Sequence, residues 1–470
     1  MSLRALVLLL GCVAAAVLAW RAWSPREPDG PPPNVLLVSI DSLRADHLHA
    51  YGYPRETSPT IDALAKEGAL FRWAVTPTTW TLPSHMTLLT AMPPEQHGVS
   101  RNDRQLDPSA ITLAEVLRDA GYATAGFVAG PYVRAMYGFD QGFDVYDESI
   151  VKDGLFEPLR GATSPESTRL VTEYLEGWDR DGRRKPFFVF LHLWDPHYDY
   201  DPPPPYDTMF DPDYTGTISG VDFLLNTRVR PDMDRRDLEH IVALYDGEIR
   251  YTDEHLGRIV DLLRRLGVLD DTIVVVTADH GEEFFEHGRK GHGEVLYDET
   301  MLVPLVIRYP RRVEPGRVIE EQVRLMDVAP TILELAGVEA PADFGTPAGT
   351  PHGATSFASA LAPDGDEPPS LLAFGTTKMG KFTRRAVRRL DGKLIVQSPG
   401  PPHPEAYDLA TDPGERVNLL RQDDKHKLAE DLEGELASWA SLWAEGPRYA
   451  KSLEVPSSQE ERLRALGYIR

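Results

Sequence analysis

The sequence predicts an α/β protein with a large, mostly parallel central sheet flanked by helices, followed by a small C-terminal antiparallel sheet and a helix. Between residues 34 and 336, uninterrupted apolar runs alternate with segments of helical periodicity. Such runs are typical of strands buried on both faces of a parallel sheet. Beyond residue 370, short segments alternate apolar and polar side chains, as antiparallel strands do, and residues 428–443 have the pattern of a final amphipathic helix.

Three apolar runs mark the central strands, at residues 34–40, 186–191 and 272–276. In open α/β sheets, ligands bind beyond the carboxyl ends of the strands. A single acidic residue there more often just ends a strand, but its repetition favours a reaction site. The candidate ligands or bases are Asp41 after the first run, His192, Asp195 and His197 after the second, and Asp279 and His280 after the third.

Helix signals separate these strands. A helix is expected to begin at Ser58-Pro59, because proline is favoured in the first helical turn. Residues 112–115 read Thr-Leu-Ala-Glu, which is a capping box, and residues 238–263 carry a long apolar stripe. We expect a further strand at residues 303–307 and a further helix from Asp327.

Composition narrows the class of protein. With 470 residues and 42% hydrophobic content, the chain can bury one large core or two smaller ones, as a folded enzyme does. The chain has 49 Lys and Arg but 73 Asp and Glu, which gives a net charge of −24. This negative charge argues against a nucleic-acid partner. An anionic substrate therefore needs a local positive site, such as a metal ion. The only cysteine is Cys12, which excludes an intrachain disulfide and a cysteine-based zinc site.

Residues 1–24 are expected to be a signal peptide or membrane anchor, since an apolar run follows Arg4. Residues 9–12 resemble a lipoprotein cleavage box, but the apolar run continues beyond it, so we favour an export segment that is either cleaved or retained. Residues 25–33 form a proline-rich linker. We therefore expect an exported, membrane-associated protein on the periplasmic or extracellular side, whose oligomeric state the sequence leaves open.

A second boundary follows the main α/β pattern. After Gly337 the composition shifts to Pro, Gly, Ala and Ser, which predicts a linker or a long surface excursion. We expect a catalytic domain at residues 34–369 and a C-terminal subdomain at residues 370–470.

Residues 79–90 contain the candidate nucleophile. Pro83 suits the first turn of a helix, which leaves Thr81 just ahead of the helix N-terminus. Free backbone N–H groups and the helix dipole there favour an anion or a developing alkoxide. Taken alone, the stretch is more often an ordinary helix cap. The Asp279-His280 pair, with an oxygen and an imidazole donor, suits zinc, manganese or a similar cation.

Together these motifs resemble the sulfatase family of the alkaline phosphatase superfamily. The resemblance covers roughly residues 34–470 and rests on a strand-end Asp, a nucleophile followed by x-Pro-Ser, a central Asp-Pro-His, a later Asp-His-Gly and a C-terminal Tyr-Asp-Leu motif. In this chain these are Asp41, residues 81–84, 195–197, 279–281 and 407–415, supported by residues 138–144 and 466–468.

Departures from the family pattern bear on the chemistry. Sulfatases carry a Cys or Ser that becomes formylglycine, and an Arg four residues later, where this chain has Thr81 and His85. Threonine cannot give that aldehyde, because its β-carbon bears a methyl group. Ser42 replaces the second residue of an Asp pair, a Lys-x-His segment is not found, and His292 replaces the lysine of Gly-Lys-Gly. The chain thus looks more like the superfamily's phosphodiesterases with a threonine nucleophile.

The resemblance implies a divalent metal cofactor, calcium, manganese or zinc, as one or two ions. Asp41, Asp279 and His280 would hold the first ion, and Asp195, His197 and His292 a second. Alternatively, His192, His197 and His292 would contact substrate around a single ion. We expect His85, Asn102 and His192 to bind substrate.

The expected function is hydrolysis of sulfate or phosphate esters through a covalent Thr81 intermediate, with His197 donating to the leaving group or a substrate oxygen. Phosphate or phosphonate esters are preferred on chemical grounds, because a Thr81 sulfate must be cleaved by water directly. The alternatives are a true sulfuric ester hydrolase, a phosphotransferase that passes the group to an alcohol, and, least favoured, an inactive membrane-tethered binding protein. The substrate would be a small-molecule or polymer-borne anionic ester.

Overall fold

The computed structural model describes residues 30–151, 163–347, 349–379, 381–400, 403–421 and 426–453. The expected export segment, most of the proline-rich linker and the closing motif at residues 466–468 lie outside these residues. Residues 33–470 form one compact unit, so the expected subdomains pack as a single body. No described helix is both long enough and apolar enough to cross a membrane.

The nine-stranded central sheet confirms the predicted fold class. Its order is β10-β2-β11-β7-β1-β6-β4-β5, with β12 paired to β2. The pairs β1–β6, β1–β7, β4–β6 and β4–β5 are parallel. The strands are β1 (Asn34–Ile40), β2 (Ala69–Val75), β4 (Ala123–Phe127), β5 (Val145–Asp147), β6 (Phe187–Leu193), β7 (Thr272–Ala278), β10 (Leu302–Val303), β11 (Leu305–Arg308) and β12 (Arg317–Arg324).

One expected strand differs. Pro304 divides the run at residues 303–307 into β10 and β11, because proline has no N–H to give to a sheet. Strand β11 is antiparallel to both β7 and β2, so the sheet is mixed at this point.

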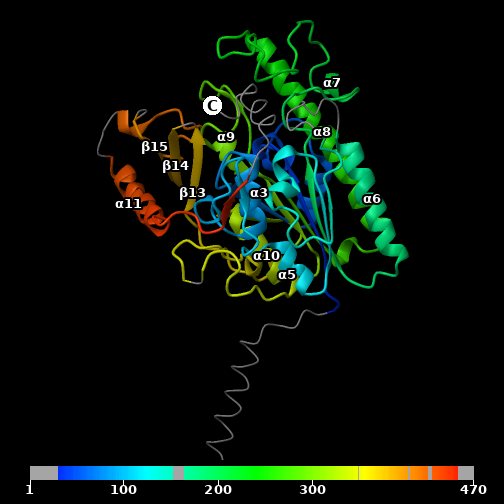
Figure 1. Ribbon diagram of the computed structural model, residues 1–470. Helices are drawn as coiled ribbons and strands as arrows, with labels where there is room; N and C mark the ends of the chain where they lie inside the picture. Colours follow the sequence, from blue (N-terminus) through cyan, green and yellow to red (C-terminus); the bar gives the residue numbers. More distant parts are fainter. Residues whose placement is uncertain are drawn as a thin grey trace, which may run out of the picture. The chain divides into compact units, whose positions relative to one another are not determined.

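Helices cover both faces of the sheet. Figure 1 shows α6 and α8 on one side and α3, α5 and α10 on the other, and α2 packs against α8. The helices are α2 (Pro59–Glu67), α3 (Thr81–Thr90), α4 (Pro94–His97), α5 (Leu113–Asp119), α6 (Ser164–Arg180), α7 (Tyr206–Met209), α8 (Arg235–Arg265), α9 (Asp298–Met301), α10 (Val328–Ala336) and α11 (Lys427–Leu442). The helix starts at Pro59 and after the Thr112 capping box are confirmed.

The segment after Gly337 is more than a linker. Phe344, Phe357 and Leu361 are buried in the main hydrophobic core. Through these three side chains, the segment after Gly337 packs against the core of the catalytic part.

The C-terminal part is the expected antiparallel sheet with one helix. Its order is β13-β14-β15-β16, and α11 packs on β14 and β15. The other sheet face packs on the catalytic part through a cluster that includes Val75 and Met301. The strands are β13 (Ala373–Met379), β14 (Phe382–Arg389), β15 (Gly392–Ser398) and β16 (Glu405–Tyr407), and two small pairs join β3 (Arg104–Leu106) with β17 (Ala450–Ser452) and β8 (Glu283–Phe284) with β9 (Lys290–Gly291).

Candidate active site

Thr81 is the first residue of α3, with Trp80 as the N-cap, whereas the sequence placed it just ahead of the helix. Pro83 lies in the first turn, as predicted. Thr81 is almost fully buried, and its hydroxyl lies 3.3 Å from His280 Nε2. The hydroxyl is therefore held at a helix N-terminus, where the dipole favours negative charge on oxygen.

Asp41, Asp279 and His280 come together because β1 and β7 are parallel neighbours. Ile40 pairs with Ala278, which brings the next residue of each strand to the same edge. Their ligand atoms all lie within 4.8 Å of one another. His280 Nε2 is 3.3 Å from Asp279 Oδ2 and 3.9 Å from Asp41 Oδ1. Three residues that the sequence predicted as ligands therefore form one cluster.

The chemistry of this cluster fits a divalent cation. Asp279 Oδ1 accepts hydrogen bonds from the N–H groups of Ser42 and His280, at 3.2 and 2.9 Å. Asp279 Oδ2 is buried without a hydrogen-bond partner among the described residues. His280 Nδ1 lies 2.9 Å from the Gly281 carbonyl oxygen, which assigns the proton to Nδ1 and leaves the Nε2 lone pair facing the carboxylates. A buried, unpaired carboxylate oxygen is costly unless a cation neutralises it.

Ser42 shapes the turn after β1. Its φ is +56°, a left-handed conformation that is uncommon for a residue other than glycine. This turn directs the Ser42 N–H to Asp279, while its hydroxyl donates to Asp41 Oδ1 at 3.0 Å. Ser42 thus joins the two carboxylates.

His85 lies beneath Thr81, and both of its ring nitrogens already have hydrogen-bond partners, so neither is free for the predicted contact with substrate. Nδ1 is 2.9 Å from the Thr81 carbonyl oxygen, and Nε2 is 2.9 Å from the Ser39 hydroxyl. Burial lowers the pKa of His85 to about 3, although the Asp279 carboxylate, 3.5 Å from Nδ1, opposes that shift. A neutral His85 supports the start of α3.

His192 and Asn102 were the other predicted substrate contacts. His192 Nε2 lies 3.2 Å from Asp41 Oδ2, and its Nδ1 has no hydrogen-bond partner among the described residues. Burial lowers the pKa of His192 to about 4, so the neutral ring orients Asp41. Asn102 is nearly buried in the turn before β3, and no hydrogen bond among the described residues joins its side chain to the Thr81 cluster.

Asp195, expected in a second ligand set, is engaged by the start of α6. Its Oδ1 accepts hydrogen bonds from the Thr163 N–H and hydroxyl, both at 2.6 Å, and its Oδ2 accepts one from the Ser164 N–H at 2.8 Å. The carboxylate therefore satisfies the N-terminus of α6, which favours an anion. Among the described residues, Asp195, His197 and His292 do not form a ligand group.

His197 and His292 lie beside the cluster. Their ring centroids are 5.0 Å apart, and the His292 ring is 4.1 Å from that of His280. His197 Nδ1 is 2.7 Å from the Tyr198 carbonyl oxygen, and burial lowers the pKa of His197 to about 3. Burial also lowers the pKa of His292, assisted by repulsion from His280.

Glu282 is a site residue that sequence reasoning missed. Its Oε1 lies 3.1 Å from His292 Nδ1, and its Oε2 accepts a 2.8 Å hydrogen bond from the Tyr200 hydroxyl. Burial raises the pKa of Glu282 to about 8. The available signal was the acidic pair that directly follows Asp279-His280-Gly281, but only packing shows that Glu282 orients His292.

Comparisons with known proteins agree with this geometry. Residues 33–338 match the family profile described as Sulfatase. The chain is 24% identical to the N-acetylglucosamine-6-O-sulfatase of Bacteroides thetaiotaomicron, over 90% of this chain and 89% of the relative. It is 28% identical to the multifunctional alkaline phosphatase superfamily protein PehA of Trinickia caryophylli, over 66% and 74%. The phosphonate monoester hydrolase structure of Agrobacterium radiobacter has a TM-score of 0.70 at 24% identity, over 87% and 96%.

The fold, the buried ligand cluster and these matches define a hydrolase of sulfuric or phosphoric esters. The profile spans well over half of the chain, so the chain belongs to the sulfatase family, within the alkaline phosphatase superfamily. The motif-based resemblance is thereby confirmed. A threonine at the nucleophile position stays a prediction.

Proposed function

We propose that this protein is a metal-dependent hydrolase of phosphate or phosphonate esters that acts through a covalent Thr81 intermediate. The observation that carries the proposal is the buried Thr81 hydroxyl at the start of α3, 3.3 Å from His280 Nε2 and beside the Asp41–Asp279 pair. A hydroxyl needs activation to act as a nucleophile, and this position offers both a helix dipole and a ligand set.

Asp41, Asp279 and His280 would hold one divalent cation. When bound, the cation supplies positive charge that lowers the pKa of a neighbouring hydroxyl and neutralises the ester's anionic oxygens. We propose a single ion, since Asp195 is engaged at α6.

In the first step, the Thr81 oxygen forms a bond to phosphorus as the bond to the leaving alcohol breaks. The proton of the Thr81 hydroxyl passes to solvent water, and the departing alkoxide takes up a proton from the His197 imidazolium. In the second step, water attacks the Thr81 phosphoryl group, which frees the hydroxyl and releases the phosphate or phosphonate. Ser42, His85 and His192 keep the carboxylates and α3 in place through the contacts described above.

His197 remains the candidate donor to the leaving group. Its Nδ1 proton points to the Tyr198 carbonyl oxygen, so Nε2 can donate only from the imidazolium form. An anionic substrate next to the ring favours that form, because opposite charge raises the pKa of an imidazole.

Phosphorus esters are favoured over sulfate esters because of the residue type at position 81. A formylglycine hydrate releases sulfate by collapse of a hemiacetal, whereas a Thr81 sulfate needs direct attack of water on sulfur. Attack of water on a phosphoryl group held beside a cation is the route that other phosphoryl-transfer sites use. The relatives include enzymes named for both sulfate and phosphonate esters.

Matched 4-nitrophenyl phosphate, phenylphosphonate and sulfate esters test this choice with the purified full-length chain. We expect kcat/KM to be higher for a phosphorus ester than for the sulfate. A higher kcat/KM for the sulfate would contradict the proposed chemistry. An acid-quenched reaction should contain a phosphorylated peptide that includes Thr81, detected by mass spectrometry.

We also propose export with membrane association, supported by the Arg4-led apolar run and the linker at residues 25–33. Fractionation of cells that express the native chain should recover it with membranes or outside the cytoplasm. Recovery of full-length protein in the soluble cytoplasmic fraction would refute this location.

A further inference from the structure

A pocket of about 260 Å³ is lined by residues that lie close to Thr81 along the chain, although Thr81 itself does not line it. Its lining includes Trp80 and Pro83, which flank Thr81 along the chain, and Gly293, which follows His292. The volume is slightly below the roughly 300 Å³ at which ordinary ligand pockets begin, so it suits one ring with its substituents. The pocket is therefore placed to receive the part of a substrate that adjoins the ester bond.

The rest of the lining comes from the C-terminal sheet, and two of its residues are cations. Lys378 of β13 and Arg385 of β14 both line the pocket. Arg385 pairs across the strands with Thr376, two residues before Lys378, so both cations lie on the same face of the sheet. Two adjacent cations suit a ligand with negative charge.

Neither cation has a direct partner in the described part of the chain. Among the described residues, Lys378 and Arg385 form no ion pair and donate no side-chain hydrogen bond. Glu95 also lines the pocket, but its carboxylate accepts a hydrogen bond from the Thr376 hydroxyl. Burial lowers the pKa of Lys378; the Glu95 carboxylate opposes this shift, and repulsion from Arg101, Arg385 and Arg104 adds to it. The pocket thus holds two cations against one carboxylate, a local positive excess in a chain with a net charge of −24.

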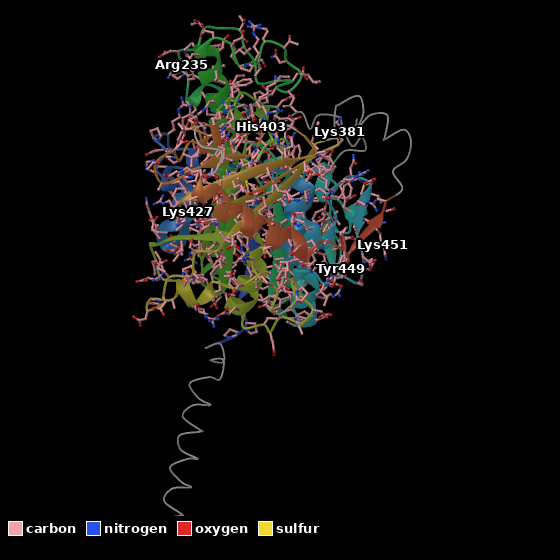
Figure 2. All side chains as sticks on the ribbon, turned by 90° about the vertical axis from the view of Figure 1, so that its left-hand side faces the viewer. Arg235, Lys381, His403, Lys427, Tyr449 and Lys451 are labelled. Carbon is pink, nitrogen blue, oxygen red and sulfur yellow. The ribbon has the colours of Figure 1, made fainter. Side chains whose placement is uncertain are left out.

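The end of α11 leaves this part of the sheet uncovered. Phe374 and Val387 pair on β13 and β14 and pack in the cluster formed with α11. The helix ends at Leu442, and Trp443, the residue after it, lines the pocket. In Figure 2, α11 crosses the outer face of the sheet from Lys427. The sheet residues beyond its end are left open to a ligand.

Two tryptophans supply apolar surface in the same pocket. Trp80 packs edge-on against Tyr132 at 5.1 Å, and Trp443 packs edge-on against Trp439 at 5.5 Å. Both side chains are half-buried and also line the pocket. Aromatic faces of this kind bury the apolar face of a ring, while neighbouring cations fix a charged substituent.

We propose that this pocket binds the leaving-group part of the substrate, and that this part is a ring-bearing alcohol with a second anionic group, such as a carboxylate or a further phosphate or sulfate. The inference rests on the proposed function, because it takes the ester bond to lie at Thr81. It makes the substrate an ester of an acidic ring compound, with Lys378 and Arg385 as specificity-determining residues.

A pair of aryl phosphate esters tests the pocket. One carries a carboxylate on the ring and the other carries a carboxamide at the same position, which keeps the ring electron-poor without the charge. A third substrate carries a second phosphate there, to separate a carboxylate preference from a general anion preference. We expect kcat/KM to favour both anionic substrates by about tenfold or more over the amide, as a charge-assisted hydrogen bond does. In Lys378→Gln and Arg385→Gln the ratio should fall, and in the double variant it should approach one.

Arg389→Gln is the matched control. Arg389 lies on the same strand and face as Arg385, four residues on, but it pairs with Asp391 at 2.5 Å. This variant should keep the ratio of the unchanged protein. A double variant of Lys378 and Arg385 that retains the full preference, or an unchanged protein without one, would overturn the inference while leaving the proposed hydrolysis intact.

Binding of the released alcohol tests the pocket without turnover. Calorimetry should detect the carboxylated phenol with the unchanged protein and with Arg389→Gln, and much weaker binding with the double variant. Absence of binding to the unchanged protein would refute the pocket assignment. If the unchanged protein binds the phenol but turns over none of the esters, only the proposed function is refuted.

Discussion

Removal of the Thr81 hydroxyl is the sharpest test of the site. In Thr81→Val the γ-methyl group stays and the oxygen is lost, and Thr81→Ala removes both. We expect kcat to fall by about 10³- to 10⁶-fold, or about 4 to 8 kcal/mol, as is usual when a covalent nucleophile is removed.

The structure supports a large fall in kcat because the neighbouring hydroxyl groups already donate hydrogen bonds to other acceptors. Ser42 donates to Asp41 Oδ1, Thr79 donates to the Val295 carbonyl oxygen, and Ser84 donates to the Asp279 carbonyl oxygen. None of these three can replace Thr81 without breaking a buried hydrogen bond. Residual turnover should therefore come only from direct attack of water.

Steady-state kinetics with the preferred phosphorus ester measure the loss, and the urea midpoint checks the fold. The hydroxyl has one long contact, at 3.3 Å, so the free energy of unfolding should change by no more than about 1 kcal/mol in Thr81→Val. Thr81→Ser is the control, because it keeps a hydroxyl and should retain most of the activity. Near-normal kcat in Thr81→Val would show that Thr79 or a water is the nucleophile.

Three further predictions concern metal, leaving group and stability. Elemental analysis should find about one equivalent of divalent metal in both the unchanged protein and His292→Lys, and chelation should abolish turnover of the phosphorus ester. Two equivalents in the unchanged protein that fall to one in the variant would instead support a site with two metal ions. His197→Ala should slow an alkyl ester far more than a 4-nitrophenyl ester, since only a poor leaving group needs a proton, and equal losses would remove His197 as donor. Asp298→Asn should lower the free energy of unfolding by about 3 to 5 kcal/mol in urea at neutral pH, because Arg388 and Lys393 are buried against this carboxylate at 2.8 Å. Burial alone would raise the pKa of Asp298, but these two cations hold it well below its usual range. The stabilisation is therefore complete above the pKa of the unfolded chain, about 3.9, and should shrink as the pH falls below that value. A difference in unfolding free energy between Asp298→Asn and the unchanged protein that does not vary with pH would contradict this explanation.

The sequence by itself predicted the class of sheet and the residues of the candidate metal cluster. Apolar runs at residues 34–40 and 272–276 became adjacent parallel strands, because only a strand covered on both faces needs such uniform apolarity. The sequence did not determine that these strands are neighbours; their pairing in the structure brings Asp41 and Asp279 to the same edge. Pro83 likewise predicted a helix start at this point, but the structure begins α3 at Thr81, which the sequence had placed just ahead of the helix.

Tertiary structure decided which polar residues near that edge face the reaction. Asp195 follows its strand just as Asp41 does, yet the N-terminus of α6 engages its carboxylate, and it does not join the cluster of Asp41, Asp279 and His280. Glu282 orients His292, and Lys378 lines the pocket beside Thr81 because α11 ends before it covers that part of the sheet. Local pattern specifies a strand or a helix end, because those depend on neighbours along the chain. The partner of a buried polar group is set by packing between distant segments, and no sequence periodicity records it.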